Sequence, residues 1–221
     1  MILLASDRPV TLIGGGPAPV DLLARAMAIA PVAIGADGGA ETPLPGGARV
    51  VAAIGDMDSV RDPEGLRARG VAVHELAEQD TTDLEKCLYS VAAPLTLGVG
   101  FLGGRVDHHL AALNALARVA PRPVILLGAE DLVIACPQTL TLDLAPGARV
   151  SFFPLAPVTG LVSEGLRWPV AGLAFAPGGR IGTSNVATGG RMRAGFDGPG
   201  MLAILPLDQL EAVAAALEGR G

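Results

Sequence analysis

The regular exchange of short apolar runs and helical segments between residues 10 and 128 constrains the fold more than any other feature of this sequence. The apolar runs have the length and composition of buried strands, and they occupy 10–15, 31–39, 50–56, 71–76, 95–101 and 123–128. The segments with helical spacing occupy 19–30, 64–70, 81–93 and 106–120. Strands that alternate with helices indicate a mostly parallel sheet covered on both faces. We therefore predict an N-terminal α/β domain, residues 1–128, with a Rossmann-like three-layer architecture.

The pattern changes after residue 128 to short strand-like runs that proline or glycine interrupts every few residues. Such runs are typical of an antiparallel sandwich or barrel. We predict a second, all-β sandwich domain over residues 129–221, with a helix at 207–220 packed on its outside.

Composition and charge narrow the range of partners. Half of the 221 residues are hydrophobic, and the formal net charge of -6 comes with arginines that are scattered singly, so no basic stripe is available for a nucleic-acid backbone. No segment reaches the ~18 consecutive apolar residues of a membrane span. The two cysteines, Cys87 and Cys136, are too few for a disulfide framework or a zinc site and are expected to be buried thiols. We expect a soluble, cytoplasmic protein with neither a nucleic-acid nor a membrane partner.

Polar residues or glycines follow four of the predicted strands. In an open α/β sheet, ligands bind outside the carboxyl ends of the strands. The segments at those ends are Gly14–Gly16, Asp37, the pair Asp56 and Asp58, and the stretch "GGRVDHH" at 103–109. Glycines alone also serve tight turns, so a ligand contact and a simple turn both stay open for Gly14–Gly16.

Asp56 and Asp58 form the stronger signal. Two carboxylates placed two residues apart on an extended segment point the same way, and they repel each other unless a cation lies between them. Mg²⁺ held by a few carboxylates and by substrate phosphates is the usual arrangement. The alternative is a solvated acidic turn.

A third acid stands in the segment "EQDTTDLEKCL", residues 78–88. Thr82 and Glu85 have the spacing of a capping box, which places Asp83 in the first turn of a helix, where the helix dipole favours a negative charge in any case. A purely structural role therefore stays open for Asp83. Gln79 and Asp80 precede the cap and have no such structural reason to be polar.

Arg105 and Asp107 stand where a strand passes into a helix. Arginine offers phosphoryl oxygens a rigid fork of donors, whereas the simpler interpretation is a helix start with Asp107 at or near its N-cap. His108 and His109 diverge by about 100° on a helix, so at least one of them is expected to pack locally. Lys86 is the only lysine and follows no glycine-rich loop, so a P-loop is absent.

Six motifs occur in a fixed order: "GADGGA" (35–40), "GDMDS" (55–59), "QDTTDLEKCL" (79–88), "GGRVDHHLAALNAL" (103–116), "VTGLVSEGLRW" (158–168) and "GTSN" (182–185). In this order and spacing the sequence resembles the thiamine pyrophosphokinase family. The resemblance implies an α/β domain that binds Mg-ATP, a β-sandwich that helps to bind thiamine, and an active site formed between the two subunits of a homodimer. It also implies transfer of the pyrophosphoryl group of ATP to the hydroxyl of thiamine, giving thiamine diphosphate and AMP.

The same resemblance assigns roles to individual residues. Its catalytic set is Asp56, Asp58, Gln79, Asp83, Arg105 and Asp107, of which Asp56, Asp58 and Asp83 hold the Mg²⁺. The residues that we expect to bind ATP and thiamine are Gly15, which follows the first strand outside the six motifs, and Asp37, Gly38, Asp80, Thr82, Gly104, His108, Ser184 and Asn185. Trp168 marks the strand beside the thiamine site, and Val186 replaces a glutamate of the family pattern.

Three other functions fit parts of the pattern. A pyrophosphokinase that acts on a pterin alcohol would use similar metal chemistry. A phosphatase with an aspartyl nucleophile would use the D-x-D of "AAIGDMDSV", but it needs a later lysine, and Lys86 comes early and lies in a helix. A nucleotide-sensing module without catalysis would need no closely set acids.

Overall fold

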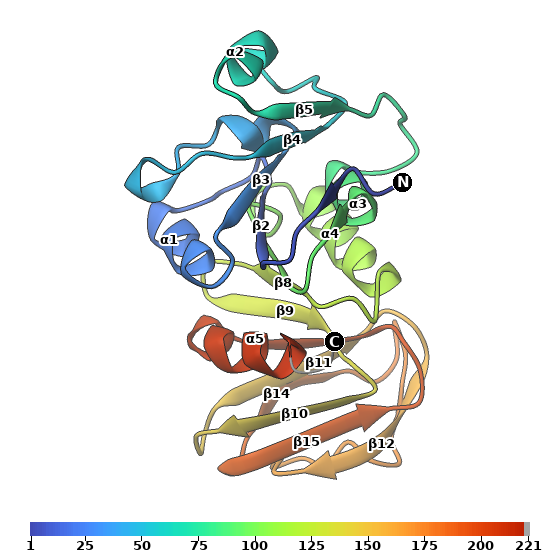
Figure 1. Ribbon diagram of the computed structural model, residues 1–221. Helices are drawn as coiled ribbons and strands as arrows, with labels where there is room; N and C mark the ends of the chain where they lie inside the picture. The colour runs from blue at the N-terminus through green and yellow to red at the C-terminus, as the bar shows by residue number, and fades with distance from the viewer. Residues whose placement is uncertain (219–221) are drawn as a thin grey trace. The chain divides into compact units, whose positions relative to one another are not determined.

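The computed structural model describes residues 1–218, and these form two compact units (Figure 1). The first unit comprises Met1–Ala115 and Leu126–Ala129, and the second comprises Leu116–Ile125 and the described residues from Glu130 onward. The predicted domain limits, 1–128 and 129–221, stay a prediction. None of the helices in residues 1–218 is long and apolar enough to cross a membrane.

The strands and helices of the first unit confirm the predicted alternation. In chain order they are β1 (Leu4–Ala5), β2 (Val10–Ile13), α1 (Val20–Ile29), β3 (Val32–Ala36), η1 (Asp37–Glu41), η2 (Pro45–Gly47), β4 (Ala52–Gly55), α2 (Pro63–Ala68), β5 (Ala72–Glu75), α3 (Asp83–Ser90), β6 (Val91–Ala92), β7 (Thr96–Val99) and α4 (Val106–Arg118). The bounds of β8 (Val124–Leu127) and of α4 run across the limits of the two units.

Five strands of this unit form a parallel sheet in the order β7-β2-β3-β4-β5. All residues of β2, β4 and β7 are buried, as expected for a parallel sheet with both faces covered. The chain passes outward from β2 to β5 and then returns to the opposite side of β2 as β7. Such a reversal is where an open α/β sheet binds its ligands, at the carboxyl ends of the strands.

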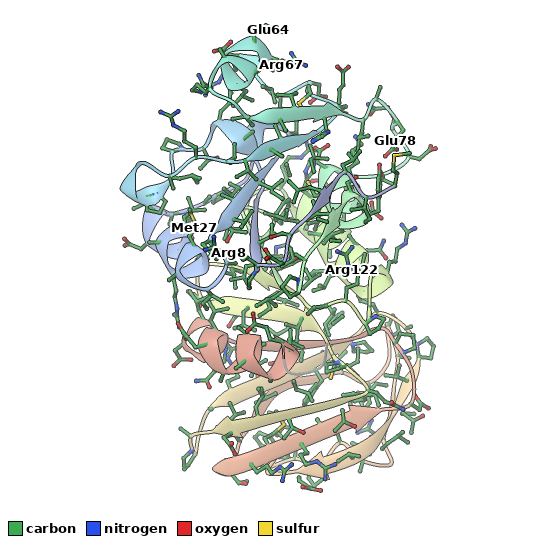
Figure 2. The ribbon with its side chains drawn as sticks, in the orientation of Figure 1. Arg8, Met27, Glu64, Arg67, Glu78 and Arg122 are labelled. Carbon is green, nitrogen blue, oxygen red and sulfur yellow. The ribbon has the colours of Figure 1, made fainter. Side chains whose placement is uncertain are left out.

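The helix starts follow local sequence signals. Thr82 caps α3 with the predicted capping box, in which the Thr82 side chain accepts from the amide of Glu85 and the Glu85 side chain accepts from the amide of Thr82. Asp62 caps α2 by accepting from the amide of Gly65 at 2.8 Å. A Glu64–Arg67 ion pair of 2.6 Å lies on the exposed surface of α2 (Figure 2).

One predicted helix is shorter than its sequence pattern suggests. The helical spacing runs over 81–93, but α3 ends at Ser90 and Val91 adopts an extended conformation with φ of -111°. Val91 and Ala92 instead form β6, which pairs in parallel with Leu4 and Ala5 of β1. The β-branched Val91 favours this extended state, and the partner strand lies too far away in sequence for periodicity to reveal it.

The second unit is built from short antiparallel strands. Its elements are β9 (Asp131–Ala135), β10 (Thr139–Leu144), β11 (Arg149–Pro154), β12 (Val158–Glu164), β13 (Ala174–Phe175), β14 (Gly182–Val186), β15 (Gly190–Phe196), β16 (Met201–Pro206), η3 (Leu207–Gln209) and α5 (Leu210–Glu218). One set of antiparallel neighbours is β14-β11-β16-β9, and the other is β10-β15-β12-β13. The antiparallel character is as predicted.

Aromatic and aliphatic side chains fill the core of this unit. The ring of Phe196 lies 5.3 Å from that of Phe152 and 6.0 Å from that of Phe175. Helix α5 lies against β10 and buries one face. The last predicted helical residues, 219 and 220, lie outside the described part of the chain.

Candidate active site

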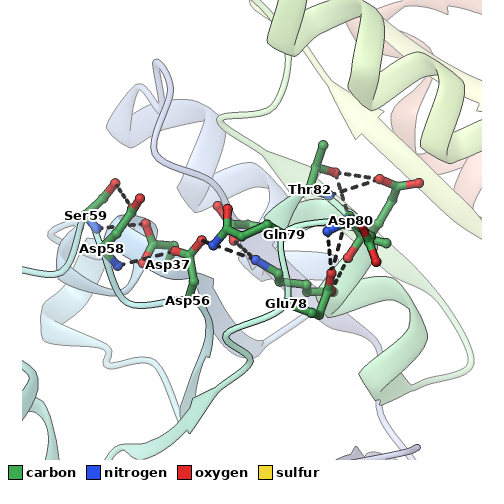
Figure 3. A network of polar contacts seen from close by, with 12 residues as sticks. Asp37, Asp56, Asp58, Ser59, Glu78, Gln79, Asp80 and Thr82 are labelled. Atoms are coloured by element: carbon green, nitrogen blue, oxygen red, sulfur yellow. Dashed lines mark hydrogen bonds and ion pairs between the residues drawn. The ribbon is translucent and has the colours of Figure 1, made fainter.

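Three aspartates meet at the carboxyl ends of β3 and β4 (Figure 3). Asp37 directly follows β3, and Asp56 and Asp58 follow β4. One carboxylate oxygen from each residue lies within 4.8 Å of those of the other two. The predicted pair is therefore part of a three-carboxylate group, and its third member is Asp37, which the sequence placed among the binding residues.

The backbone around Asp37 is tightly constrained. Its φ is 46°, in the left-handed region that non-glycine residues rarely adopt. The α-carbon of Gly55 faces it so closely that a Cβ at residue 55 would lie 2.8 Å from the Cβ of Asp37. Gly55 thus lets β4 carry Asp56 close to Asp37, and observed strain of this kind is common at binding sites.

The carboxylate of Asp37 is only partly satisfied. The residue is 4% exposed, and its Oδ2 accepts a hydrogen bond from the amide of Ser59 at 3.2 Å. Its Oδ1 is buried and accepts no hydrogen bond from any of residues 1–218. Because a buried carboxylate oxygen without a partner is costly, a cation bound to these oxygens fits the donor set.

Asp56 is the most connected member of the group. Its Oδ2 accepts from Gln79 Nε2 at 2.9 Å and lies 3.4 Å from Lys86 Nζ, while its Oδ1 accepts from the amide of Asp58 at 3.3 Å. The hydrogen bond from Gln79 is the largest cause that lowers the pKa of Asp56, and the charge of Lys86 acts in the same direction. Asp56 is therefore ionised at neutral pH, and the predicted residue Gln79 contacts it directly.

Lys86 is the residue that the sequence interpretation undervalued. Its side chain is 2% exposed, and its Nζ lies 3.4 Å from both Asp56 Oδ2 and Asp83 Oδ1. Burial acts to lower the pKa of Lys86, but the carboxylates of Asp83 and Asp56 more than offset it, so the pKa is raised. The position of Lys86 early in the chain and on a helix argued against the lysine of an aspartyl phosphatase. In the structure, that position places a buried cation between two acids of the site.

Asp83 lies beside the three-carboxylate group rather than in it. Burial raises the pKa of Asp83, the charge of Asp37 raises it further, and Lys86 lowers it. The same helix start leaves Asp80 and Thr82 exposed, with the Thr82 hydroxyl engaged in the cap. The assignment of Mg²⁺ to Asp56, Asp58 and Asp83 stays a prediction, and the geometry favours Asp37 as the third ligand.

Arg105 and Asp107 form a two-point ion pair at the start of α4. Arg105 donates from Nε at 3.1 Å and from Nη2 at 2.6 Å to the two carboxylate oxygens, and both residues are exposed. The bond from Arg105 is the main reason why the pKa of Asp107 is lowered to about 2. Asp107 Oδ1 also accepts from the amide of His108, so the expected helix-start role and the pairing with Arg105 coexist.

The two histidines differ as expected. His109 Nδ1 accepts a hydrogen bond from the amide of Gly103 at 3.2 Å and so closes the turn before α4. His108 is exposed on the first turn, and Gly104, also exposed, has a φ of 66°. His108 and Gly104 are therefore accessible to a ligand, whereas His109 has a local structural role.

The three glycines after β2 differ in the space around them. A Cβ on Gly14 or on Gly16 would lie 2.6 Å from the carbonyl oxygen of Gly100, whereas a Cβ on Gly15 would meet no atom of residues 1–218 within 4 Å. Gly14 and Gly16 are thus required for the close passage of two loops. Gly38, the other glycine of the predicted binding set, faces Ser59, and a Cβ there would lie 3.1 Å from the Ser59 carbonyl oxygen.

The difference in space around Gly14 and Gly15 allows a structural role to be told apart from a ligand contact. We expect Gly14→Ala to destabilise the fold by about 1–3 kcal/mol, because the added methyl overlaps a backbone oxygen. Gly15→Ala is expected to leave the free energy of unfolding within about 0.5 kcal/mol of the unsubstituted chain and to raise the KM for ATP. Urea unfolding and steady-state kinetics measure both effects, and an unchanged KM in Gly15→Ala would remove Gly15 from the binding set.

The predicted thiamine-site residues lie in the second unit. Asn185 is 4% exposed, its Oδ1 accepts from the amide of Trp168 at 3.1 Å, and its Nδ2 donates to the Trp168 carbonyl oxygen at 2.6 Å. The side chain of Asn185 therefore holds the backbone beneath the exposed indole of Trp168, over which the Arg167 guanidinium lies at 4.9 Å. Ser184 is exposed and has a φ of 60°.

These two neighbours are expected to respond differently to substitution. Asn185→Ala removes a buried amide that pairs with both backbone groups of Trp168, and it is expected to cost about 1–3 kcal/mol of stability. Ser184→Ala removes an exposed hydroxyl, so we expect an unchanged melting temperature and a raised KM for thiamine. Thermal unfolding together with kinetics tests the pair, and a destabilised Ser184→Ala would contradict this division of roles.

Two sequence models of protein families match the chain. The thiamin pyrophosphokinase catalytic domain matches residues 23–126, and the thiamin pyrophosphokinase vitamin B1 binding domain matches residues 136–196. The chain belongs to the thiamin pyrophosphokinase family. The catalytic-domain match includes Asp37, Asp56, Asp58, Lys86 and Arg105, and the vitamin B1 match includes Trp168, Ser184 and Asn185.

Members of this family from plants are similar in sequence. Thiamine pyrophosphokinase 1 of Oryza sativa subsp. japonica is 31% identical over 153 residues, which are 60% of this chain and 57% of the rice protein. Thiamine pyrophosphokinase 1 of Arabidopsis thaliana is 31% identical over 150 residues, which are 60% of this chain and 56% of that protein. The matched part thus spans little more than half the length of these relatives.

Solved structures of thiamin pyrophosphokinases have the same fold. The enzyme from Geobacillus thermodenitrificans aligns with a TM-score of 0.70 at 24% identity and covers 89% of this chain and 96% of its own. The yeast thiamin pyrophosphokinase aligns with a TM-score of 0.73 at 15% identity and covers 97% of this chain and 94% of its own.

Proposed function

We propose that this chain transfers the pyrophosphoryl group of ATP to the hydroxyl of thiamine, giving thiamine diphosphate and AMP. The observation that carries the proposal is the three-carboxylate group of Asp37, Asp56 and Asp58, in a unit of the chain that matches the catalytic domain of the family. One buried oxygen of Asp37 accepts no hydrogen bond from residues 1–218. Alignment with plant thiamine pyrophosphokinases supports the choice of thiamine over a pterin alcohol. A buried lysine between two acids supports a site for phosphates over a simple acidic turn.

The reaction requires positioning and charge neutralisation. The thiamine hydroxyl oxygen forms a bond to the β-phosphorus, the bond from that phosphorus to the oxygen bridging to the α-phosphorus breaks, AMP departs with that oxygen, and the hydroxyl proton is released. No covalent enzyme intermediate is needed. Mg²⁺ held by Asp37, Asp56 and Asp58, with Asp83 beside them, would neutralise phosphate charge.

The remaining polar residues have proposed roles that follow from their chemistry. Lys86 balances the charge of the acids, and Gln79 orients the Asp56 carboxylate. Arg105 offers its guanidinium to phosphoryl oxygens once its contact with Asp107 opens. Asp107, whose pKa is about 2 in the ion pair, is a weak base there and is better suited to accept a hydrogen bond from the hydroxyl than to remove its proton.

The proposal extends to the domain architecture, the location in the cell and the oligomeric state. We infer a Rossmann-like first domain that binds Mg-ATP and a sandwich that helps to bind thiamine through Ser184 and Asn185. We also infer a cytoplasmic homodimer in which the second domain helps to close the partner's site. Exposed apolar side chains on the second unit, Leu161, Trp168 and Ile181, support a covered surface. Sedimentation at assay concentration tests the dimer.

The nucleotide product tests the function. Purified protein is incubated with Mg-ATP and with or without thiamine, and the nucleotides are separated by chromatography. We expect AMP and thiamine diphosphate in equal amounts, and only when thiamine is present. ADP as the main product would indicate attack at the γ-phosphorus, and free phosphate without thiamine would indicate a phosphatase. AMP that depends on a pterin alcohol instead of thiamine would keep the reaction type and overturn the substrate.

A further inference from the structure

The exposed carboxylate of Glu78 accepts several hydrogen bonds within the loop between β5 and α3. Glu78 Oε2 accepts from the amides of Asp80 at 2.9 Å and Thr81 at 3.1 Å, and its Oε1 accepts from the hydroxyl of Tyr89 at 2.9 Å and from the Thr81 hydroxyl. Figure 3 shows Glu78 next to Asp80 in this loop, with dashed lines at its carboxylate. These four donors match the roughly four lone-pair sites of one carboxylate.

The contact with Tyr89 ties the loop to a rigid element. Tyr89 lies near the end of α3, whose start at Thr82 is fixed by the capping box. Glu78 therefore connects the loop both to its own backbone and to the helix that follows. The protonation states of both groups suit this role. The hydrogen bond from the Thr81 side chain is the largest cause that lowers the pKa of Glu78. Burial is the largest cause that raises the pKa of Tyr89, and the hydrogen bond to Glu78 is the next. The carboxylate stays charged and the phenol stays a donor.

The residue next to Glu78 is the one that reaches the acid group. Gln79 donates from Nε2 to Asp56 Oδ2 at 2.9 Å. Within residues 1–218, the hydrogen-bond partners of Glu78 belong to the loop or to α3, and none of them is one of the three aspartates. The direction of the Gln79 side chain depends on the loop backbone, and that backbone is shaped by the bonds to Glu78.

We propose that Glu78, anchored by the Tyr89 hydroxyl, is a positioning residue that sets Gln79 against Asp56. The inference rests on the pyrophosphoryl transfer proposed above and adds a residue that acts through Gln79 rather than on the substrates. Its consequence is that a change at Glu78 should alter turnover only as long as Gln79 is present.

A double-mutant cycle tests this dependence. Glu78→Ala is expected to lower the kcat for AMP formation about tenfold, because a small displacement of an orienting group is enough for such a loss. In a Gln79→Ala background, the same substitution should change kcat by less than about twofold. Glu78→Gln should retain most of the activity, since an amide can accept from the two backbone N–H groups and donate to the two hydroxyl oxygens. Glu64→Ala, which removes an exposed ion pair on α2, is the matched control and should leave kcat unchanged.

Hydrogen exchange of the substrate-free protein provides a second readout. The amides of Asp80 and Thr81 donate to Glu78, so a peptide covering 77–82 should exchange faster in Glu78→Ala than in the unsubstituted protein or in Glu64→Ala. The inference would be overturned if the two substitutions lowered kcat independently, so that their fold-changes multiply in the double variant, or if the exchange of this peptide did not change. AMP formation by the unsubstituted protein would still uphold the function in that case. Absence of thiamine-dependent AMP from the unsubstituted protein would overturn the function, and the exchange data would still decide whether Glu78 holds the loop.

Discussion

Asp56→Asn is expected to abolish thiamine-dependent AMP formation, with a fall of at least about 1,000-fold in kcat, in a protein that remains folded. Asp56 supplies a charged oxygen to the three-carboxylate group and is the residue on which Gln79 and Lys86 converge. Asparagine keeps the shape and one oxygen acceptor but removes the charge that a hard divalent cation requires. The loss should therefore appear both in turnover and in Mg²⁺ affinity, which calorimetric titration measures without any reaction.

The pKa of Asp56 adds a stability signature to this variant. Because that pKa is lowered in the folded state from an ordinary value of 3.8, the ionised carboxylate stabilises the fold above the ordinary value, and this contribution is lost as the pH falls through the folded-state pKa. Asp56→Asn should thus melt a few degrees lower at neutral pH, and the difference should close in acid. Asp7→Asn, at an exposed bend in the same unit, is the control. Normal activity of Asp56→Asn at saturating Mg²⁺ would contradict the role of Asp56 in the metal site.

Local signals in the sequence were sufficient for the elements and for part of the site. The capping box of Thr82 and Glu85 depends on a spacing of three residues, so the start of α3 follows from the sequence alone. Asp56 and Asp58 are likewise neighbours along the chain, and their spacing alone indicated a shared site. The carboxyl-end rule for α/β sheets placed Asp37 at the same edge, although it could not separate a metal ligand from a binding residue.

The contributions that the sequence did not reveal depend on contacts between distant segments. Lys86 became significant only when α3 placed its ammonium beside Asp56, 30 residues earlier in the chain. The signal was available, since this is the only lysine of the chain and stands three residues after Asp83, but helical spacing gives no information on burial between acids. Asn185 shows the converse, because its amide is engaged by the Trp168 backbone and so supports the fold in addition to any contact with thiamine.

Lys86→Met is expected to destabilise the fold at neutral pH by about 2–4 kcal/mol. Removing one partner of a fully buried ion pair costs about 3–5 kcal/mol, and the carboxylates of Asp56 and Asp83 are partly exposed. The Lys86 side chain is 2% exposed, and its ammonium faces Asp56 and Asp83. Methionine fills a similar volume but removes the positive charge that compensates these carboxylates and the nearby Asp37. Arg8→Met, at an exposed cation of the same unit (Figure 2), is the matched control and should unfold like the unsubstituted protein in urea.

The pH dependence and the response to Mg²⁺ identify the cause of this loss. The pKa of Asp83 is already raised by burial and by Asp37, and removal of Lys86 raises it further. A carboxyl whose folded-state pKa is raised destabilises the fold above that pKa and ceases to do so below its ordinary value of 3.8, so the deficit of Lys86→Met should shrink as the pH falls. Mg²⁺ should stabilise Lys86→Met more than the unsubstituted protein, because a bound cation replaces the missing positive charge in the folded state alone. A deficit that neither acid nor Mg²⁺ reduces would instead point to lost packing around the lysine stem, and the charge balance of the site would then not depend on Lys86.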